Sequence, residues 1–420
     1  MLNKKTILLA IRAPNFVPYI GDVINKLNID FKVIIVFDKR FSKKFETSEK
    51  IFGPSDTRKH FRYTLKHLAG VLTYNLDSYS NLKYQRRFSL YLPKLFQLIA
   101  EAIKLLHLNA FVIQKIRLTY KVLKFHRWTF EILEEVEPSA IIVVPGNNRF
   151  SVEDDYLLAG KERGIPTAVI VPTWDSITNK GTWISTPDVI FCWNSMHAAQ
   201  LKKHVIDSEI KCVGAPFFDK WYDPKTSSPR VIENSKVAVN EQYILYFGSS
   251  VNIIQNEENE LTKLCRILKD RYADKVKLYF KPHPAAKYYP KVVSNNFICL
   301  EKNPIYSSAN SEFMTLIKNA LFVTGVNTSA FLESIVLGAE VLPIIVEDSL
   351  QTKTQHFSML SNGLVELICV EDICIYIDRR IHKPYERSLL SSEKLKDFFP
   401  NSGNSSEAIA LEIQVLIQML

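Results

Sequence analysis

The sequence predicts two consecutive α/β domains, each built on a doubly wound parallel β-sheet. The chain has 420 residues, more than one compact domain usually needs, and 47% of them are hydrophobic. Short β-branched apolar runs alternate with segments of helical period, which is the pattern of βαβ units. The alternation breaks once, at the polar residues 222–240 with their two prolines, and then restarts. This composition excludes a collagen-like, low-complexity or disordered chain.

We place the first domain at residues 1–225. Its opening apolar run is too short for a signal peptide and is predicted to be the first buried strand. The strands of this domain are expected at Thr6–Ile11, Lys32–Phe37, Ala140–Val144, Thr167–Val171, Val189–Trp193 and Ile210–Val213.

After a linker at 226–240, we place the second domain at residues 241–400, followed by a C-terminal helix at 401–420. Its strands are expected at Tyr243–Phe247, Val276–Phe280, Phe297–Leu300, Leu321–Thr324 and Val341–Val346, with helices near 258–272, 311–320 and 329–337. Ligands of such sheets bind outside the carboxyl ends of the strands, so the residues that follow each strand are the candidate site residues.

Charge is distributed unevenly along the chain. The net charge is +9, but residues 1–130 alone carry 24 Lys and Arg against 8 Asp and Glu. A basic helical insertion at about 85–130 contributes two stripes of polar residues at helical spacing. The stripes are Lys94, Gln97, Glu101 and Lys104, then Gln114, Arg117, Lys121, Lys124 and Arg127. Such helices fit an anionic membrane surface, and a helical pair packed on its own domain explains the same pattern.

The six cysteines lie far apart or inside apolar runs, without a CxxC pair. They are predicted to be buried free thiols of a reducing compartment, and no metal site is expected. No apolar stretch reaches the length of a spanning helix. We therefore expect a cytoplasmic protein that is peripheral on the inner face of the cytoplasmic membrane.

The first candidate site motif, Lys281-Pro282-His283-Pro284, directly follows a predicted strand. A histidine between two prolines is held on a stiff backbone, where its imidazole can meet a phosphate oxygen. A loop histidine without a function explains the same four letters.

The second motif follows the strand Leu321–Thr324 and contains Asn327, Thr328 and Ser329. Thr328 or Ser329 stands where a helix N-cap belongs, so hydroxyl and backbone N–H groups can form an anion site there. One turn later, Glu333 can accept hydrogen bonds from ribose hydroxyls. A simple N-cap followed by a surface glutamate is the alternative.

The third motif is Gly248-Ser249, the turn after the first strand of the second domain. Small residues at such a turn allow backbone N–H groups to approach a phosphate. A plain turn explains the same residues, but all three motifs follow strands of one domain.

The fourth motif lies in the first domain, after the strand Thr167–Val171. Trp174, Asp175, Thr178 and Lys180 combine an aromatic ring, a carboxylate, a hydroxyl and an ammonium group, which suits a site that positions a sugar and moves a proton. Asp175 is the predicted catalytic residue, and an Asx turn is the alternative.

Asn147, after another strand, is a further candidate residue for contact with the molecule that accepts the sugar. The reserve candidates for the base are Glu153, Asp154 and Asp155, which also suit the start of a helix.

With these motifs in this order, most of the chain resembles the GT-B class of nucleotide-sugar-dependent glycosyltransferases. The part from Lys281 to Gly338 is similar to bacterial sialyltransferases, Kdo (3-deoxy-octulosonic acid) transferases and teichoic-acid glycerophosphotransferases. The resemblance implies two Rossmann-like domains facing a central cleft. It implies that His283, Thr328 and Ser329 contact the phosphate of a cytidine nucleotide and that no cofactor is needed beyond the nucleotide-sugar substrate. It also implies that Glu333 binds a sugar hydroxyl.

The segment from Trp174 to Lys180 is similar to the Trp-His-Gly-Thr-Pro-Leu-Lys segment of the glycerophosphotransferases, whose histidine is the base. Here Asp175 replaces that histidine, while the tryptophan and the lysine are kept. Aspartate is the usual base or nucleophile in glycosyl chemistry, so the difference favours sugar transfer.

We therefore expect a metal-independent glycosyltransferase that moves a sugar from a CMP-activated donor, such as Kdo or sialic acid, to a glycan or glycolipid acceptor. Asp175 would be its base or nucleophile, and His283 would assist the leaving phosphate. Three alternatives stay open: a polyol-phosphate transferase of the CDP-glycerol type, a nucleotide-sugar epimerase, and a non-enzymatic protein that binds anionic glycans. The expected partners are a nucleotide sugar, the acceptor and an anionic membrane surface, and no nucleic acid.

Overall fold

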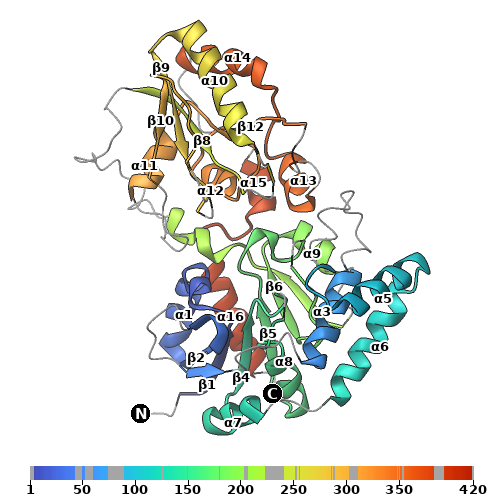
Figure 1. Ribbon diagram of the computed structural model, residues 1–420. Helices are drawn as coiled ribbons and strands as arrows, with labels where there is room; N and C mark the ends of the chain where they lie inside the picture. The colour runs from blue at the N-terminus through green and yellow to red at the C-terminus, as the bar shows by residue number, and fades with distance from the viewer. Residues whose placement is uncertain are drawn as a thin grey trace. The chain divides into compact units, whose positions relative to one another are not determined.

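The computed structural model divides the chain into two compact units. Unit 1 comprises Met1–Asp219 together with Lys396–Leu420, and unit 2 comprises Lys220–Leu395 (Figure 1). The described residues are 4–42, 50–52, 60–73, 89–123, 127–148, 150–178, 180–202, 207–222, 241–250, 253–254, 256–284, 286, 289–301, 311–347, 349, 351, 354–382 and 392–418. The predicted linker at 226–240 lies outside them.

Unit 1 contains a parallel sheet of seven strands in the order β3-β2-β1-β4-β5-β6-β7. The strands are β1 Thr6–Ile11, β2 Lys32–Asp38, β3 Lys50–Phe52, β4 Ala140–Val144, β5 Thr167–Ile170, β6 Val189–Cys192 and β7 Glu209–Cys212. β1 pairs with β2 on one side and with β4 on the other, so the strand order reverses at the carboxyl ends of β1 and β4. In a doubly wound sheet this reversal is where ligands bind.

Helices cover both faces of this sheet. The helices of unit 1 are α1 Val17–Asp30, α2 Lys39–Ser42, α3 Phe61–Thr73, α5 Lys94–Leu105, α6 Asn109–Val122, α7 Arg127–Val136, α8 Asp155–Glu162, α9 Ser195–Leu201 and α16 Ser405–Gln418, with α15 Ser392–Phe398 at the boundary. One apolar core joins α1 and α16 to the sheet, and a second joins α7 and α8 to it. A separate, smaller core holds α3, α5 and α6 together.

Unit 2 contains a parallel sheet of five strands in the order β10-β9-β8-β11-β12. The strands are β8 Gln242–Phe247, β9 Val276–Lys281, β10 Phe297–Cys299, β11 Val323–Gly325 and β12 Val341–Pro343. The helices are α10 Glu257–Tyr272, α11 Ser311–Asn319, α12 Ala330–Val336, α13 Gln355–Ser361 and α14 Ile373–His382. The strand order reverses between β8 and β11, which places their carboxyl ends at the predicted binding edge.

The predicted fold class is confirmed: each unit is a Rossmann-like, doubly wound parallel sheet. The predicted strands agree with the observed ones within one or two residues at most ends, because strands buried on both faces are continuous apolar runs. β12 is shorter than predicted, and β3 was missed. β3 has three residues at the edge of the sheet, pairs only with the end of β2 and has no apolar run of its own to reveal it.

Two further predictions concern the cysteines and the membrane. All six cysteines are free thiols, as predicted, but Cys212 and Cys369 are exposed. The prediction that every cysteine is buried is therefore wrong, because an apolar run does not determine which of its side chains face outward. In the part of the chain that the structure describes, no helix is long and apolar enough to cross a membrane.

Candidate functional site

Three of the predicted motifs meet at the carboxyl edge of the unit 2 sheet. The Gly248 N–H, after β8, donates to the Lys281 carbonyl at the end of β9 over 2.9 Å. A Cβ on Gly248 would lie 3.1 Å from the backbone nitrogen of His283. A larger residue at position 248 would therefore crowd the loop that carries His283. The Asn327 N–H, after β11, donates to Ser249 Oγ over 3.0 Å. Three loops far apart in the sequence are thus joined by direct contacts.

The turn after β8 already binds the carboxyl group of Glu257 at the start of α10. The Ser249 N–H donates to both of its oxygens, over 2.9 and 3.1 Å, and the Tyr246 hydroxyl donates over 3.2 Å. Burial raises the pKa of Glu257 to about 7. A phosphate that uses the Ser249 N–H must therefore displace this carboxylate. The sequence analysis missed Glu257, although an acidic residue in the first turn of a helix was the available signal.

Hydrogen bonds from polar side chains hold the loop between β11 and α12 in place. Gln351 Nε2 donates to the carbonyls of Val326 and Ile344 over 2.6 and 2.8 Å. The buried Asn327 amide donates to Thr354 Oγ1 over 3.1 Å. These hydrogen bonds, including those of the Asn327 side chain, fix the loop at the carboxyl ends of the strands.

The hydroxyls of this loop differ in their contacts. Ser329 occupies the N-cap position of α12 and is exposed, but its side chain makes no capping hydrogen bond. Thr328 Oγ1 instead accepts from the Ala330 N–H over 3.3 Å. Glu333 lies one turn into α12, where burial raises its pKa to about 7 and the positive charge of Lys220 opposes that rise.

Lys281 and Pro284, on either side of His283 in the motif, have defined surroundings. The Lys281 ammonium donates to the Glu301 carbonyl over 2.6 Å, which directs this side chain along the sheet edge. Pro284 follows His283 in a turn closed by the Ala286 N–H, which donates to the His283 carbonyl over 2.8 Å. The imidazole is thus carried by a short, tightly bonded loop.

In unit 1, Asp175 lies in a short 3-10 helix, Trp174–Ser176, after β5. Lys180 Nζ is 2.9 Å from Asp175 Oδ2, and Thr173 Oγ1 donates to Oδ1 over 2.9 Å. Both members of the ion pair keep 30% of their side-chain surface exposed. The carboxylate is therefore held in one orientation and keeps part of its surface open to solvent, as a base requires.

Packing of the Trp174 ring holds this loop in place. Its buried ring stacks on His197 of α9 at 4.7 Å between centroids and packs against Phe398. Burial lowers the pKa of His197 to about 3, so its ring is neutral, and His197 Nε2 lies 3.2 Å from the Trp174 carbonyl. The sequence analysis missed His197, whose only local signal is the N-cap Asn194 before it.

Two other predicted residues line the same loop from inside. Asn147, after β4, is buried and its amide donates to the Ser176 carbonyl over 2.7 Å. Thr178 is also buried, and neither its hydroxyl nor Asn147 Oδ1 has a hydrogen-bond partner among the described residues. Asn147 therefore connects the carboxyl ends of β4 and β5.

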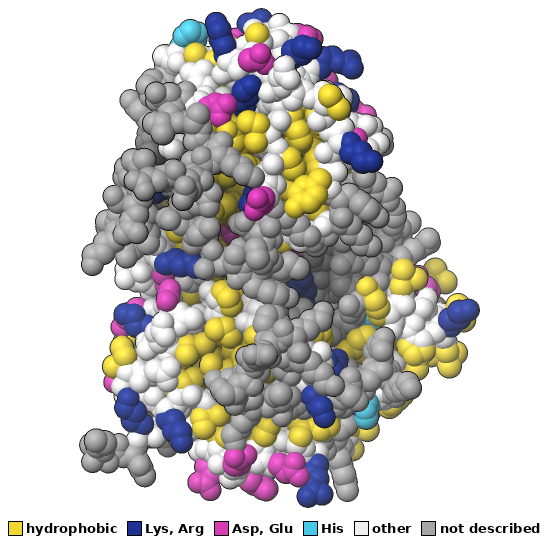
Figure 2. All heavy atoms as spheres, turned by 60° about the vertical axis from the view of Figure 1, so that its left-hand side comes forward, with side chains coloured by type: hydrophobic (Ala, Val, Ile, Leu, Met, Phe, Trp, Pro, Cys, Tyr) yellow, Lys and Arg dark blue, Asp and Glu magenta, His cyan; other side chains and the backbone are white. Residues whose placement is uncertain are grey.

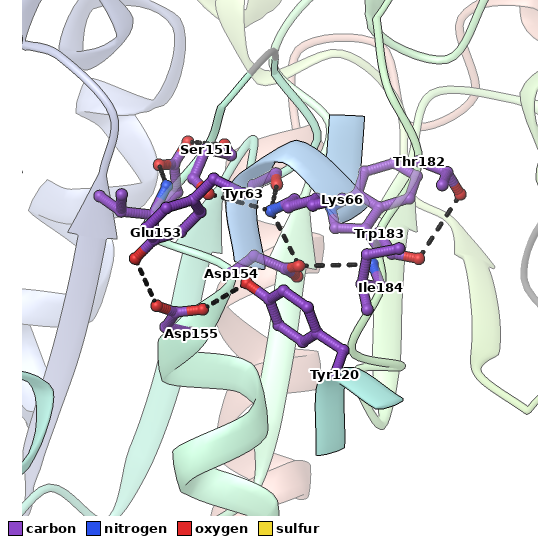
Figure 3. Close-up of polar contacts among 12 residues, drawn as sticks. Tyr63, Lys66, Tyr120, Ser151, Glu153, Asp154, Asp155, Thr182, Trp183 and Ile184 are labelled. Atoms are coloured by element: carbon purple, nitrogen blue, oxygen red, sulfur yellow. Dashed lines mark hydrogen bonds and ion pairs between the residues drawn. The ribbon is translucent and has the colours of Figure 1, made fainter. Parts of the chain in front are cut away.

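The three reserve carboxylates are fully buried, and each has polar partners within unit 1. Figure 3 shows part of this set of contacts. Glu153 accepts from Ser151 Oγ and from the Val152 N–H. Asp154 pairs with Lys66 at 2.8 Å, and Asp155 pairs with Arg62 at 3.0 Å.

Asp155, the first residue of α8, also accepts from the hydroxyls of Tyr63 and Tyr120, each over 2.7 Å. The reading of these carboxylates as the start of a helix is therefore the one the structure supports. Among the described residues no group of three or more side chains could hold a metal ion.

No family model matches the chain, and no curated protein matches it in sequence. In structure it is similar to a UDP-N-acetylglucosamine 2-epimerase, with a TM-score of 0.58 and 12% identity over 100% of this chain and 98% of that one. It is also similar to the UDP-GlcNAc 2-epimerase of Neisseria meningitidis bound to UDP-GlcNAc (TM-score 0.55, 12% identity, 98% of this chain and 100% of that one).

A third similar structure is CalG4, the calicheamicin glycosyltransferase, with a TM-score of 0.55 and 11% identity over 100% of both chains. At this identity the three structures establish the fold, which is GT-B. The predicted GT-B resemblance is thereby confirmed at the level of the fold.

Proposed function

We propose that this chain is an enzyme that acts on a nucleotide sugar, with the nucleotide bound at the carboxyl edge of the unit 2 sheet. One observation carries the proposal: the loops after β8, β9 and β11 meet there through the Gly248, Ser249 and Asn327 contacts. This edge, next to the strand-order reversal, is where doubly wound sheets bind nucleotides. His283 would stabilise phosphate charge, and Glu333 would accept hydrogen bonds from ribose.

The structural neighbours favour epimerisation as the reaction. Two of the three neighbours named above are UDP-GlcNAc 2-epimerases that align with almost the whole chain. We therefore propose UDP-GlcNAc or a related UDP-sugar as the first substrate to test, ahead of the CMP-sugars that the sequence motifs suggest. The sugar would change configuration at one carbon while its bond to the nucleotide is kept in the product.

Glycosyl transfer is the second candidate, and Asp175 favours it. A partly exposed carboxylate, oriented by Thr173 and Lys180, suits deprotonation of an acceptor hydroxyl. CalG4 shows that this fold also supports sugar transfer. In this case the nucleotide is released, and the sugar appears on a glycan or glycolipid acceptor.

Nucleotide binding is tested by thermal unfolding of the full chain with UDP, UDP-GlcNAc, CMP, CDP and GDP, each with and without Mg²⁺. A ligand at a hundred times its Kd stabilises the folded state by about 2.7 kcal/mol, which raises the Tm by several degrees. His283→Ala should lose that shift, while His382→Ala, an exposed histidine of unit 2, should keep it. If no nucleotide shifts the Tm, a non-enzymatic binding protein would be the remaining hypothesis.

The reaction is tested by following the ¹H NMR spectrum of the nucleotide sugar that binds. A new anomeric signal without release of nucleotide identifies an epimerase, and release that depends on an added glycan acceptor identifies a transferase. In either reaction Asp175→Asn should lower kcat about 10²- to 10⁴-fold. Asp22→Asn, an exposed carboxylate of α1, is the matched control. Full activity in Asp175→Asn would remove Asp175 from the mechanism.

A further inference from the structure

We propose that helices α5 and α6 form an interfacial surface that binds a bilayer of anionic phospholipid. The helices lie side by side at the edge of unit 1 and pack on α3 (Figure 1). The name "outer face" is used below for their exposed apolar side chains. These are Leu95, Leu98, Ile99, Leu105 and Leu106 of α5 and its end, and Leu108, Phe111, Leu118 and Val122 of α6 and its start.

The outer face is unusually exposed for its composition. Leu98, Leu105 and Val122 keep 70%, 81% and 83% of their surface in solvent. The opposite sides of the two helices, with Ala100, Ile113 and other apolar residues, are buried in the core shared with α3. Each helix buries one apolar side in its own domain, and the second apolar side is left in water. Exposed apolar patches of this kind mark interaction sites. Figure 2 shows hydrophobic side chains interspersed with basic ones on the projection at its right-hand edge.

Basic side chains border the outer face. Lys94, Lys115 and Lys121 are exposed on the same two helices. Lys115 Nζ lies 5.3 Å from the centre of the Phe111 ring, so charge and apolar surface are in contact. Glu101 is the one carboxylate of residues 89–123, and Lys104 pairs with it at 2.8 Å.

This combination matches an anionic bilayer better than a second copy of the chain. An isologous dimer would bring the lysines of both copies to the same interface, where like charges repel. A bilayer offers acyl chains to the leucines and phosphates to the lysines at once. Interfacial helices place their apolar side about 5–10 Å into the headgroup region, which the length of a leucine or phenylalanine side chain allows.

The polar stripes of these helices are not uniformly exposed. Lys94 and Glu101 are exposed, but Gln97 and Lys104 are only partly exposed, and Arg117 of the second stripe is partly buried as well. Lys124 lies outside the described residues, and Arg127 begins the separate helix α7. The leucines face solvent instead, so membrane contact follows from the observed orientation rather than from the charge stripe.

The test is co-sedimentation of the full chain with vesicles of phosphatidylcholine alone and of phosphatidylcholine mixed with phosphatidylglycerol. We expect binding to the mixed vesicles, weaker binding to the neutral ones, and a decrease with salt. The double variant Leu98→Gln with Leu105→Gln should bind at least about tenfold more weakly. Lys115→Gln and Lys121→Gln should each weaken binding about fivefold.

The controls are substitutions of exposed residues elsewhere on the chain. Leu411→Gln on α16 and Ile375→Gln on α14 test exposed apolar residues, and Lys275→Gln tests an exposed lysine. All substituted side chains are at the surface, so circular dichroism and the Tm should stay unchanged. The nucleotide-induced Tm shift should also stay unchanged, which separates this proposal from the proposed function.

Two results would overturn the proposal. One is equal vesicle binding by wild type and by the Leu98→Gln, Leu105→Gln variant. The other is a dimer, measured by light scattering, that the same variant converts to monomer, because the outer face would then be a contact between copies of the chain.

Discussion

Glu257 and Glu333 are carboxyl groups of unit 2 whose titration is displaced towards neutral pH. Burial raises the pKa of each to about 7, above the ordinary value of 4.5. Between these values the folded state holds a proton that the unfolded state has released. The free energy of unfolding therefore falls as pH rises from about 4.5 to about 7, by up to about 3 kcal/mol for each group.

We predict that the Glu257→Gln variant lacks the part of this pH dependence of the unfolding free energy that Glu257 contributes. Glutamine keeps one oxygen to accept from the Ser249 N–H but has no charge to bury, so the variant should lose less stability than wild type as pH rises from about 5 to about 7. Urea unfolding at a series of pH values between 5 and 8 measures the difference. Glu258→Gln, the exposed neighbour on α10, is the control and should follow the wild-type curve. Identical slopes for wild type and Glu257→Gln would contradict the prediction.

At the scale of elements, one carboxylate joins three helices. Asp155 begins α8 and accepts from Tyr63 of α3 and from Tyr120 of α6 (Figure 3). Arg62 of α3 also donates to it. The Arg62 guanidinium also lies 4.0 Å over the Tyr120 ring. Arg62 is buried, and Asp155 supplies a carboxylate that balances its charge.

We predict that Asp155→Ala destabilises the protein by about 3–5 kcal/mol, since it removes the carboxylate that pairs with the buried Arg62 guanidinium. Tyr120→Phe removes one hydrogen bond and should cost only about 1–2 kcal/mol. Urea unfolding compares both with Asp22→Ala, which should stay within about 0.5 kcal/mol of wild type because its side chain is exposed. A loss for Asp155→Ala no larger than that for Tyr120→Phe would show that the ion pair is dispensable.

At the scale of the whole molecule, the end of the chain completes the first unit. Ile409, Ile413 and Ile417 of α16 are buried in the same core as α1 and the sheet. The Asp219 carboxylate accepts from the N–H groups of Ser405 and Ser406, over 3.0 and 2.6 Å, at the start of that helix. Unit 1 is thus assembled from two parts of the sequence with unit 2 between them.

We predict that Ile413→Ala destabilises unit 1 by about 2–5 kcal/mol, the usual cost of removing a fully buried isoleucine. Of the five tryptophans, four belong to unit 1, so tryptophan fluorescence reports mainly on its unfolding. Leu411→Ala is the control, because Leu411 is exposed on the same helix. An effect no larger than that of Leu411→Ala would mean that α16 contributes little to unit 1.

The sequence by itself determined the fold class and most strand positions. β1 and β4 lie at their predicted bounds, because a strand buried on both faces needs an uninterrupted apolar run that stands out from its polar neighbours. It also indicated which loops meet in unit 2, since the carboxyl ends of parallel strands share one edge. Each of these inferences depends on local pattern and on a general rule of topology.

The tertiary structure alone decided which groups occupy that edge and which helix faces are covered. Glu257 takes the Ser249 N–H, His197 supports Trp174, and α16 returns to unit 1 through contacts between residues far apart in sequence. A helical period reveals that α5 has an apolar side but not which side meets a neighbour. The reason is physical: hydrophobic burial is non-directional, so the partner of an apolar face is selected by the packing of the whole chain.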